Sequence, residues 1–168
     1  FMDDGYIVAP TEIGLKVIAQ FAEWIKDELS LELNTHKSEV LSNEGEEQQT
    51  MRKIREGPET CRGIKLGRLE GVREEAEWGE GVGIMVCGYP MGDGKYIEKL
   101  VDEFIESQLA ELEKISKMLR DEKGEGRRVR LDALHALITW CYQATPMYLA
   151  QGIDPEIMAP KLRRLDNG

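Results

Sequence analysis

The longest regular pattern in the sequence is a series of apolar residues at helical spacing between Lys95 and about Arg120. The members of the series share one broad face: Ile97, Leu100, Val101, Phe104, Ile105, Leu109, Leu112, Ile115 and Leu119. Such a series predicts a long amphipathic helix. Because an apolar helix face needs another element to cover it, we expect the C-terminal part of the chain to consist of helices that pack on one another.

Two further helical patterns follow the long one. A Gly-Glu-Gly break at residues 124–126 ends the first pattern, and a second covers about residues 129–143, where Pro146 limits it. Residues 155–164 predict a last short helix. We therefore expect residues 94–168 to form a helical region.

Residues 1–93 carry a different pattern, in which short extended segments surround one helix. A tight-turn signal at Asp4-Gly5 precedes an aromatic and β-branched run at residues 6–9, which predicts a hairpin that lacks its first strand. Apolar residues at helical spacing predict a helix over residues 11–30. Extended pieces are predicted at residues 31–33 and 39–41, and a buried strand is predicted at residues 82–87.

The segment at about 43–81 has the least regular pattern of the chain. It is rich in Gly, Glu and Arg, and it predicts a mobile insertion with one short helix near residues 46–55. Extended segments therefore come first and paired helices afterwards. This order predicts an α+β fold with a first part at residues 1–93 and a helical part at residues 94–168.

The charge of the chain is acidic and unevenly distributed. The net charge is −10, and residues 1–50 alone hold 11 acidic and 3 basic groups. A protein that binds nucleic acid only through phosphate contacts should be basic overall. The charge therefore argues against an autonomous nucleic-acid binder, but it is compatible with an acidic metal-binding half joined to a locally basic grip.

Cysteine usage and hydropathy indicate the compartment. No apolar run approaches the roughly 20 residues of a membrane-spanning helix, and residues 1–25 lack the pattern of a secretory signal. Cys61, Cys87 and Cys141 are odd in number and widely spaced, which suggests neither a disulfide framework nor a metal knuckle. We expect a chain without membrane contact in a reducing intracellular compartment, nuclear or cytoplasmic.

Two adjacent carboxylates, Asp3 and Asp4, stand at the predicted tight turn. A hairpin tip leaves both side chains able to point into a cleft, where they are suited to hold divalent cations for two-metal phosphoryl transfer. Aspartate is also a common turn residue, so a solvated acidic pair is the alternative interpretation.

Four motifs, in order, resemble those of reverse transcriptases. The Phe-Met-Asp-Asp-Gly box at residues 1–5 resembles the aromatic-x-Asp-Asp box, and Asn-Thr-His-Lys-Ser-Glu at residues 34–39 resembles the Asn-x-x-Lys-Ser/Thr-Glu turn of non-long-terminal-repeat retroelements. Residues 87–92 resemble the Leu-Gly-x-x-x-Gly primer-grip hairpin, with Cys87 in place of leucine. Residues 133–149 resemble the helix and Pro-x-Tyr-Leu segment that close the thumb-like region.

The resemblance implies part of a polymerase palm, with catalytic hairpin, helix and short strands, followed by a helical thumb-like region. It covers the chain outside about residues 43–81. It implies an RNA-directed DNA polymerase with RNA template, DNA primer and deoxynucleoside triphosphates as partners. Asp3 and Asp4 would bind Mg²⁺, and Lys37 would assist the leaving pyrophosphate. The alternative interpretation of Lys37 is an ordinary surface lysine beside Glu39. The primer grip would comprise Gly88, Tyr89, Pro90 and Gly92.

A basic bend follows the long helix. Its cations gather around the Gly-Glu-Gly break and alternate with acidic residues: Lys117, Arg120, Lys123, Arg127, Arg128 and Arg130. Such a bend is suited to sequence-independent contacts with a nucleic-acid backbone, as in a thumb. A solvated, charge-rich loop is the alternative.

The chain starts directly at the first motif, so we expect it to be a piece of a longer protein. A further metal-binding aspartate of the family lies outside it, and the piece alone should not polymerise. A non-catalytic retroelement relic or a helical interaction module is the rival interpretation. If the piece lacks part of its sheet, residues 6–9 should form an unpaired edge. The helix face with Phe21 and Ile25 should then be exposed.

Overall fold

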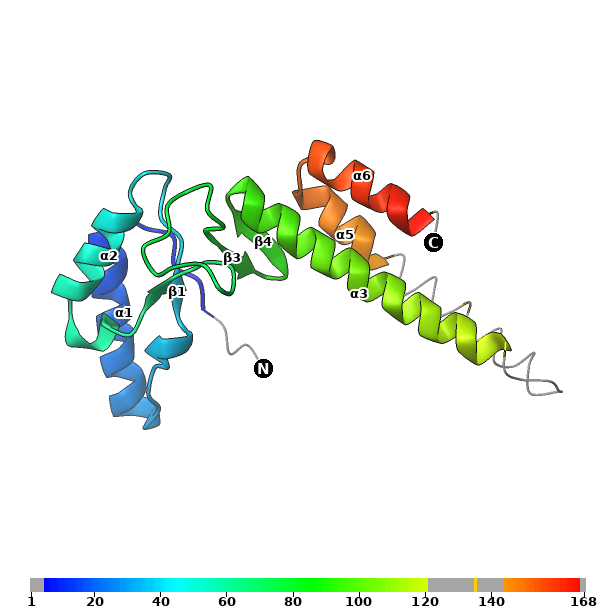
Figure 1. Cartoon of the computed structure of the whole chain (residues 1–168). Helices are drawn as coiled ribbons and strands as arrows, with labels where there is room; N and C mark the ends of the chain where they lie inside the picture. The colour runs from blue at the N-terminus through cyan, green and yellow to red at the C-terminus, as the bar shows by residue number, and fades with distance from the viewer. Residues whose placement is uncertain (1–4, 121–134, 136–143, 167–168) are drawn as a thin grey trace. The chain divides into compact units, whose positions relative to one another are not determined.

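The structure is a computed structural model that describes residues 5–120, 135 and 144–166. The chain divides into two compact units, Phe1–Ile97 and Glu98–Gly168, which we call the N-terminal unit and the C-terminal unit and describe separately. Helices are combined with small sheets, so the fold is of the mixed α+β kind that the sequence predicts (Figure 1).

Helix α1 (Thr11–Leu29) confirms the helix predicted at residues 11–30. Pro10 precedes it with φ −52°, a value that suits entry into a helix. The helix ends at Ser30, which adopts a left-handed conformation with φ 53° and donates its backbone N–H to the Lys26 carbonyl at 3.1 Å. Leu15 and Ile25 are the buried residues of α1.

A second apolar face of α1 is open to solvent. Its residues are between two-fifths and three-fifths exposed: Ile13, Val17, Phe21 and Trp24. The rings of Phe21 and Trp24 stack with their centroids 6.0 Å apart. The expected exposure of Phe21 is confirmed, but that of Ile25 is wrong. Ile25 lies two turns after Ile18, on the face that packs toward the core.

Residues 5–10 form no strand, although a strand was predicted at residues 6–9. Among the described residues no neighbouring strand supplies hydrogen-bond partners to this segment, and an extended segment becomes a strand only when it is paired. Tyr6, Ile7 and Val8 are exposed, as the sequence predicts.

A β–α–β unit lies at the centre of the N-terminal unit. Strand β1 (Glu39–Val40) pairs in parallel with β2 (Lys65–Leu66), and helix α2 (Glu47–Glu56) lies between them in the chain. Parallel neighbours need such a crossover connection, usually a helix. The extended piece predicted at residues 39–41 is confirmed, whereas residues 31–33 form no strand.

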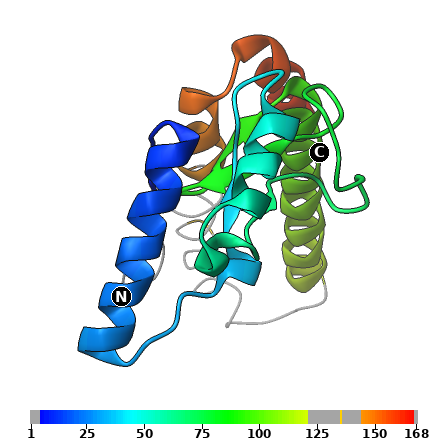
Figure 2. The ribbon, with the colours of Figure 1, turned by 90° about the vertical axis from the view of Figure 1, so that its left-hand side faces the viewer.

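Residues 43–81 supply most of the core of the N-terminal unit. Ile54 of α2, Cys61 and Ile64 pack with Leu15 of α1, while Leu66 packs with Ala76 and Val82. Figure 2 shows α1 and α2 side by side. The predicted helix at residues 46–55 is confirmed as α2, but the expectation of little further structure is wrong. The apolar residues of this segment are scattered without a period, and tertiary contacts alone bring them together.

A hairpin forms a second two-stranded sheet. Strands β3 (Gly83–Val86) and β4 (Tyr89–Gly92) are antiparallel, and a single bridge between Arg68 and Val82 links β3 to the chain after β2. Gly67 permits this approach, because a Cβ at Gly67 would collide with the Ile84 side chain. The strand predicted at residues 82–87 is confirmed as β3.

The C-terminal unit contains most of α3 (Gly94–Arg120), α5 (Ala144–Gly152) and α6 (Pro155–Asp166). Val101 and Ile105 of α3 and Met158 of α6 are buried. Asp102 of α3 accepts a 2.6 Å hydrogen bond from Lys161 and a 3.2 Å hydrogen bond from Arg164, both on α6. The predicted packing of helices after Lys95 is therefore confirmed.

The helices of this unit agree with the prediction at residues 95–120 and 155–164. Residues 129–143, together with Trp140 and Cys141, lie outside the described residues except for His135, which is helical. Pro146 was expected to limit a helix, but it lies in the first turn of α5, where a missing N–H costs no helical hydrogen bond. None of the described helices combines the length and the apolar character that crossing a bilayer requires.

The two faces of α1 predict different costs for the same substitution. Ile25→Ala should lower the free energy of unfolding by about 2–4 kcal/mol, because it removes a buried side chain. Ile13→Ala, at an exposed position of the same helix, should change it by less than about 0.5 kcal/mol. Urea unfolding measures both values, and equal costs at the two positions would contradict the orientation of α1.

Candidate functional site

The described part of the chain contains some of the predicted site residues but not the carboxylate pair. Asp3 and Asp4 lie outside the described residues. Lys37 ends the short 3-10 helix η1 (Thr35–Lys37), directly before β1, and its side chain is exposed. In the part that the structure describes, no three carboxylate, imidazole or thiol groups lie close enough together to hold a metal ion.

The predicted grip residues form a hairpin with a two-residue turn. Cys87 and Gly88 connect β3 to β4, and both have positive φ, 50° and 83°. Two left-handed residues are typical of the type I′ turn, whose twist matches that of a hairpin. Glycine adopts this conformation freely, whereas Cys87 carries a strain of roughly 1 kcal/mol. A hairpin is therefore present where the resemblance implies one.

Exposure divides the four predicted grip residues. Gly88 is exposed at the turn and Tyr89 is half-buried, whereas Pro90 is buried and Gly92 pairs with Gly83 at the base of the hairpin. A ligand at the tip would therefore meet Gly88 and Tyr89. Met85 and Met91, about half exposed, provide apolar surface on the same hairpin.

Tyr6 connects the chain after the carboxylate pair with the tip of this hairpin. The backbone N–H of Cys87 donates to the Tyr6 hydroxyl at 3.2 Å, across 81 residues of sequence. Tyr6 lies two residues after Asp4 and three after Asp3. The residue that directly follows the first motif thus contacts the third motif, and the sequence alone did not predict this hydrogen bond.

The base of the hairpin is closed by Tyr96. A Cβ at Gly83 would collide with the Tyr96 ring, so the glycine allows the ring to lie directly on the strand. Tyr96 is buried. Burial, together with the negative charge of Glu39, raises the pKa of Tyr96 to about 12, which keeps its hydroxyl protonated at neutral pH.

Asp93 is a buried carboxylate between the hairpin and α3. Its Oδ2 accepts hydrogen bonds from the backbone N–H groups of Gly79 at 2.8 Å, Gly81 at 2.9 Å and Val82 at 2.7 Å. Its Oδ1 accepts from the N–H of Tyr96 at 2.8 Å, in the first turn of α3. Asp93 thus caps α3 and holds the loop before β3 against it.

The environment of Asp93 favours its ionised form. Burial by itself would raise the pKa of the carboxyl group, but the backbone N–H groups, led by that of Tyr96, stabilise the negative charge more strongly. The pKa of Asp93 therefore lies below its ordinary value. Because all four donors come from the backbone, the carboxylate fixes main-chain positions and leaves no oxygen directed at a ligand.

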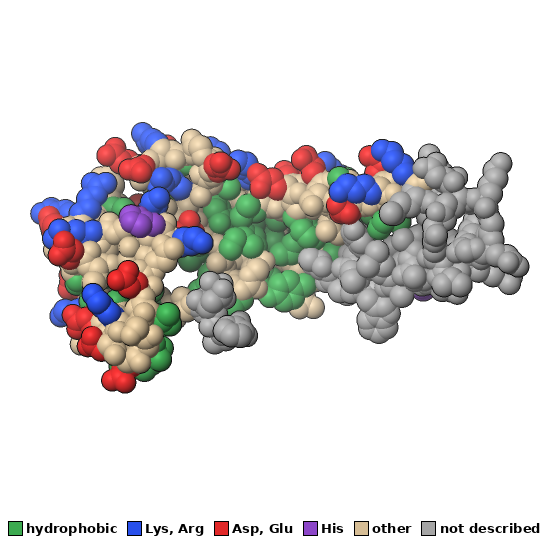
Figure 3. Space-filling view, turned by 90° about the horizontal axis from the view of Figure 1, so that it is seen from below, with side chains coloured by type: hydrophobic (Ala, Val, Ile, Leu, Met, Phe, Trp, Pro, Cys, Tyr) green, Lys and Arg blue, Asp and Glu red, His purple; other side chains and the backbone are tan. Residues whose placement is uncertain are grey.

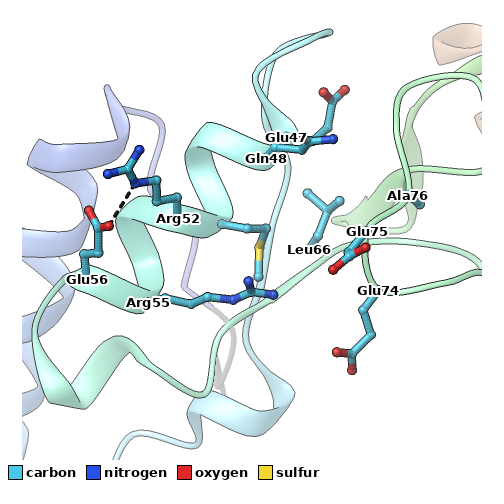
Figure 4. Close-up of a pocket in the computed structure, with 10 residues that line it drawn as sticks. Glu47, Gln48, Arg52, Arg55, Glu56, Leu66, Glu74, Glu75 and Ala76 are labelled. Carbon is cyan, nitrogen blue, oxygen red and sulfur yellow. Dashed lines mark hydrogen bonds and ion pairs between the residues drawn. The ribbon is translucent and has the colours of Figure 1, made fainter.

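A groove of about 530 Å³ lies between α2 and the segment after β2. Figure 4 shows the Arg55 side chain directed from α2 toward the segment that carries Glu74 and Glu75, whereas Arg52 is paired with Glu56 on the opposite side of α2, at 2.8 Å. At its end, the buried Glu47 accepts a hydrogen bond from the Trp78 N–H at 3.1 Å and so joins α2 to this segment. Four glutamates and two arginines line the groove, so its charged side chains leave a net charge of −2.

The basic bend is mostly outside the described part. Lys117 is exposed at the end of α3 and pairs with Glu113 at 2.8 Å. The side chain of Arg120 is outside the described part, and so are Lys123, Arg127, Arg128 and Arg130. The prediction of a backbone-binding bend therefore stays a prediction.

Sequence reasoning missed Asp93, Tyr96 and Glu47. The signal for Asp93 was an aspartate directly before a long amphipathic pattern, which is typical of a helix N-cap. No local signal marks Glu47 or Tyr96, because their partners are distant in sequence. Comparison with family models, curated proteins and solved structures gave no match to this chain.

Asp93→Asn should lower the free energy of unfolding by about 2–3 kcal/mol near pH 7, because an amide NH₂ would meet backbone donors where a carboxylate now accepts. The folded-state pKa is depressed, so this stabilisation is present above the unfolded pKa of about 3.9 and is lost as pH falls through the folded value. Urea unfolding of both proteins should therefore give a difference that shrinks below about pH 4. The exposed Asp27→Asn serves as the control. A difference of constant size from neutral to acid pH would contradict the role of the charge.

Proposed function

We propose that this chain is the C-terminal portion of the palm and the thumb-like region of an RNA-directed DNA polymerase of retrotransposon type. Its partners are an RNA template, a DNA primer and deoxynucleoside triphosphates. In the reaction, the primer 3′ oxygen forms a bond to the α-phosphorus of the nucleotide, the bond from that phosphorus to the bridging oxygen breaks, and pyrophosphate leaves.

The hydrogen bond between Tyr6 and Cys87 is the observation that carries this proposal. A polymerase must hold the primer 3′ end beside its metal-binding carboxylates, because the reacting atoms must be close and aligned. Tyr6 lies on the turn of the hairpin that resembles a primer grip. Asp4 is only two residues before Tyr6. Chain connectivity therefore limits the distance between the Cα atoms of Asp4 and Tyr6 to about 7 Å.

Asp3 and Asp4 are the proposed metal ligands. Carboxylate oxygens are the donors that Mg²⁺ prefers, and a further carboxylate from outside this chain would complete the set. When bound, the two ions stabilise negative charge on the attacking and leaving oxygens. The two aspartates would hold the ions, and the neighbouring hairpin would position the primer.

The hairpin suits a role in positioning. Its type I′ turn, its glycine-paired base and the contact with Tyr96 make it a rigid projection rather than a loose loop. Asp93 fixes the main chain beneath it through four hydrogen bonds. A rigid support is what a primer end requires, because small displacements of reacting groups cost large factors in rate.

Lys37 is the proposed helper of the leaving group. Its ammonium is exposed and makes no ion pair with another described residue, so it is available to an incoming phosphate. There it stabilises charge on the departing oxygen or donates a proton to it. The helices of the C-terminal unit and the basic bend would then follow the duplex as a thumb does.

A second candidate is a non-catalytic relic or interaction module with the same fold. The open apolar face of α1 favours it, because contiguous exposed apolar surface often marks a protein-interaction site. Loss of metal-dependent chemistry on substitution of the aspartates separates the two candidates.

Replacing both Asp3 and Asp4 by Asn, in a polymerase with the complete palm, should abolish primer extension while leaving the thermal unfolding midpoint unchanged. Neutral amides fit the same turn but bind Mg²⁺ weakly. A primer-extension assay with and without Mg²⁺ measures the effect. Wild-type extension by the double variant would remove the proposed active site.

Lys37→Ala, in the same complete polymerase, should lower kcat more than it raises KM for the nucleotide, because the lysine helps mainly in the transition state. Lys16→Ala, which removes an exposed lysine of α1, is the control and should alter neither value. Single-nucleotide incorporation at varied nucleotide concentrations gives both constants. An effect confined to KM would exclude the leaving-group role.

A further inference from the structure

The segment around Arg62 runs directly beside the Lys37 loop. The Lys65 N–H donates to the Ser38 carbonyl at 3.2 Å, and Lys65 stands in register with Glu39. Two residues earlier, a Cβ at Gly63 would collide with the Thr35 hydroxyl and would lie 3.4 Å from His36 Nδ1. Residues 62–65 and 35–39 are therefore neighbours along their whole length.

Three cations on these two stretches have exposed side chains: Lys37, Arg62 and Lys65. Figure 3 shows Lys and Arg side chains beside a histidine on one face of the molecule. Within the part of the chain that the structure describes, none of the three makes an ion pair. Glu39 is the acidic residue on the same stretches, and the described ion pairs do not include it.

Unpaired neighbouring cations are unexpected in a chain with 32 acidic residues and a net charge of −10. Several other cations of the N-terminal unit form ion pairs with carboxylates: Arg52–Glu56 at 2.8 Å, Lys53–Glu12 at 3.3 Å and Arg73–Glu80 at 2.9 Å. Like charges close together repel one another, and an anionic ligand relieves that repulsion. The overall negative charge repels anions elsewhere, so an anion should bind at this cluster.

We propose that Lys37, Arg62 and Lys65 together bind a polyphosphate group, either the triphosphate of a nucleotide or a free inorganic polyphosphate. Arg62 offers a planar fork that matches two phosphate oxygens, and the two lysines act as point charges around it. The inference rests on the proposed function, because it names the group that Lys37 meets there. Its new element is the segment at residues 62–65, which lies outside the motifs that resemble reverse transcriptases.

The architecture explains how this segment reaches Lys37. Helix α2 carries the chain across the sheet, and the parallel pairing of β2 with β1 then places residues 62–65 beside η1. Ile64 and Leu66 are buried while Lys65 between them is exposed, so strand alternation turns the lysine away from the core. The burial of its apolar neighbours thus determines which side of the strand the cation occupies.

Calorimetric titration of sodium tripolyphosphate into the 168-residue chain at low salt tests the proposal. Arg62→Gln, Lys65→Gln and Lys37→Gln should each lower the association constant about threefold, and Arg62→Gln with Lys65→Gln about tenfold. Lys16→Gln and Lys26→Gln are matched controls, because they remove the same charge from exposed lysines of α1. All five side chains are exposed, so thermal unfolding midpoints should stay unchanged.

Equal losses in all five single variants would overturn the proposal, since net charge alone would then explain binding. Absence of measurable tripolyphosphate binding would overturn it too, as would binding of single-stranded DNA alone with this dependence on the three cations. A deoxynucleoside triphosphate that shows the same pattern identifies the nucleotide as the source, whereas a pattern seen only with tripolyphosphate identifies a free polyphosphate.

The test of the polyphosphate site can fail or succeed independently of the test of the proposed polymerase function. If Arg62→Gln and Lys65→Gln leave polyphosphate binding unchanged while substitution of Asp3 and Asp4 abolishes extension, the inference fails and the function stands. If the cations govern binding but the aspartates are dispensable for extension, the site stands and the polymerase proposal fails.

Discussion

The carboxylate of Asp93 joins two parts of the N-terminal unit that are separate in the chain. It accepts backbone hydrogen bonds from three residues of the segment before β3 and from the first turn of α3. Burying a carboxylate is costly unless its oxygens are satisfied, and here four donors satisfy them. The position of the hairpin, and with it the contact to Tyr6, depends on this arrangement.

The second constraint is the crossover through α2. Residues 43–81 have no regular sequence pattern. Through this crossover they nevertheless supply core residues and the strand β2 that pairs with β1. The same crossover places Arg62 and Lys65 beside Lys37. A stretch outside the family resemblance therefore contributes both to stability and to the charge around a proposed catalytic residue.

The proposed polymerase chemistry and the acidic composition are compatible. The carboxylates at the N-terminal end are suited to cations, while basic groups gather locally at Lys37, Arg62 and Lys65 and in the sequence that follows α3. Such separation gives a nucleotide or primer a local attraction within a chain that repels polyanions as a whole.

The spacing of apolar residues in the sequence was sufficient to predict three of the described helices. The sequence predicted α1, α2 and α3. In each of them apolar residues recur at the spacing that the geometry of a helix imposes. The strand predicted at residues 82–87 was also found, as β3, whereas its pairing into a hairpin was expected only from the resemblance. The candidate roles of Asp3 and Asp4 came from a carboxylate pair at a predicted turn together with the order of the motifs, and that of Lys37 came from the resemblance.

Tertiary structure alone decided the rest. Burial of Ile25 rather than Phe21, the pairing of β1 with β2, and the four donors around Asp93 depend on residues far apart in sequence. So does the proximity of Arg62 to Lys37 and of Tyr6 to Cys87. A periodic pattern reveals that a face is apolar, but only the folded chain determines what covers it, because that choice is made by packing between distant segments.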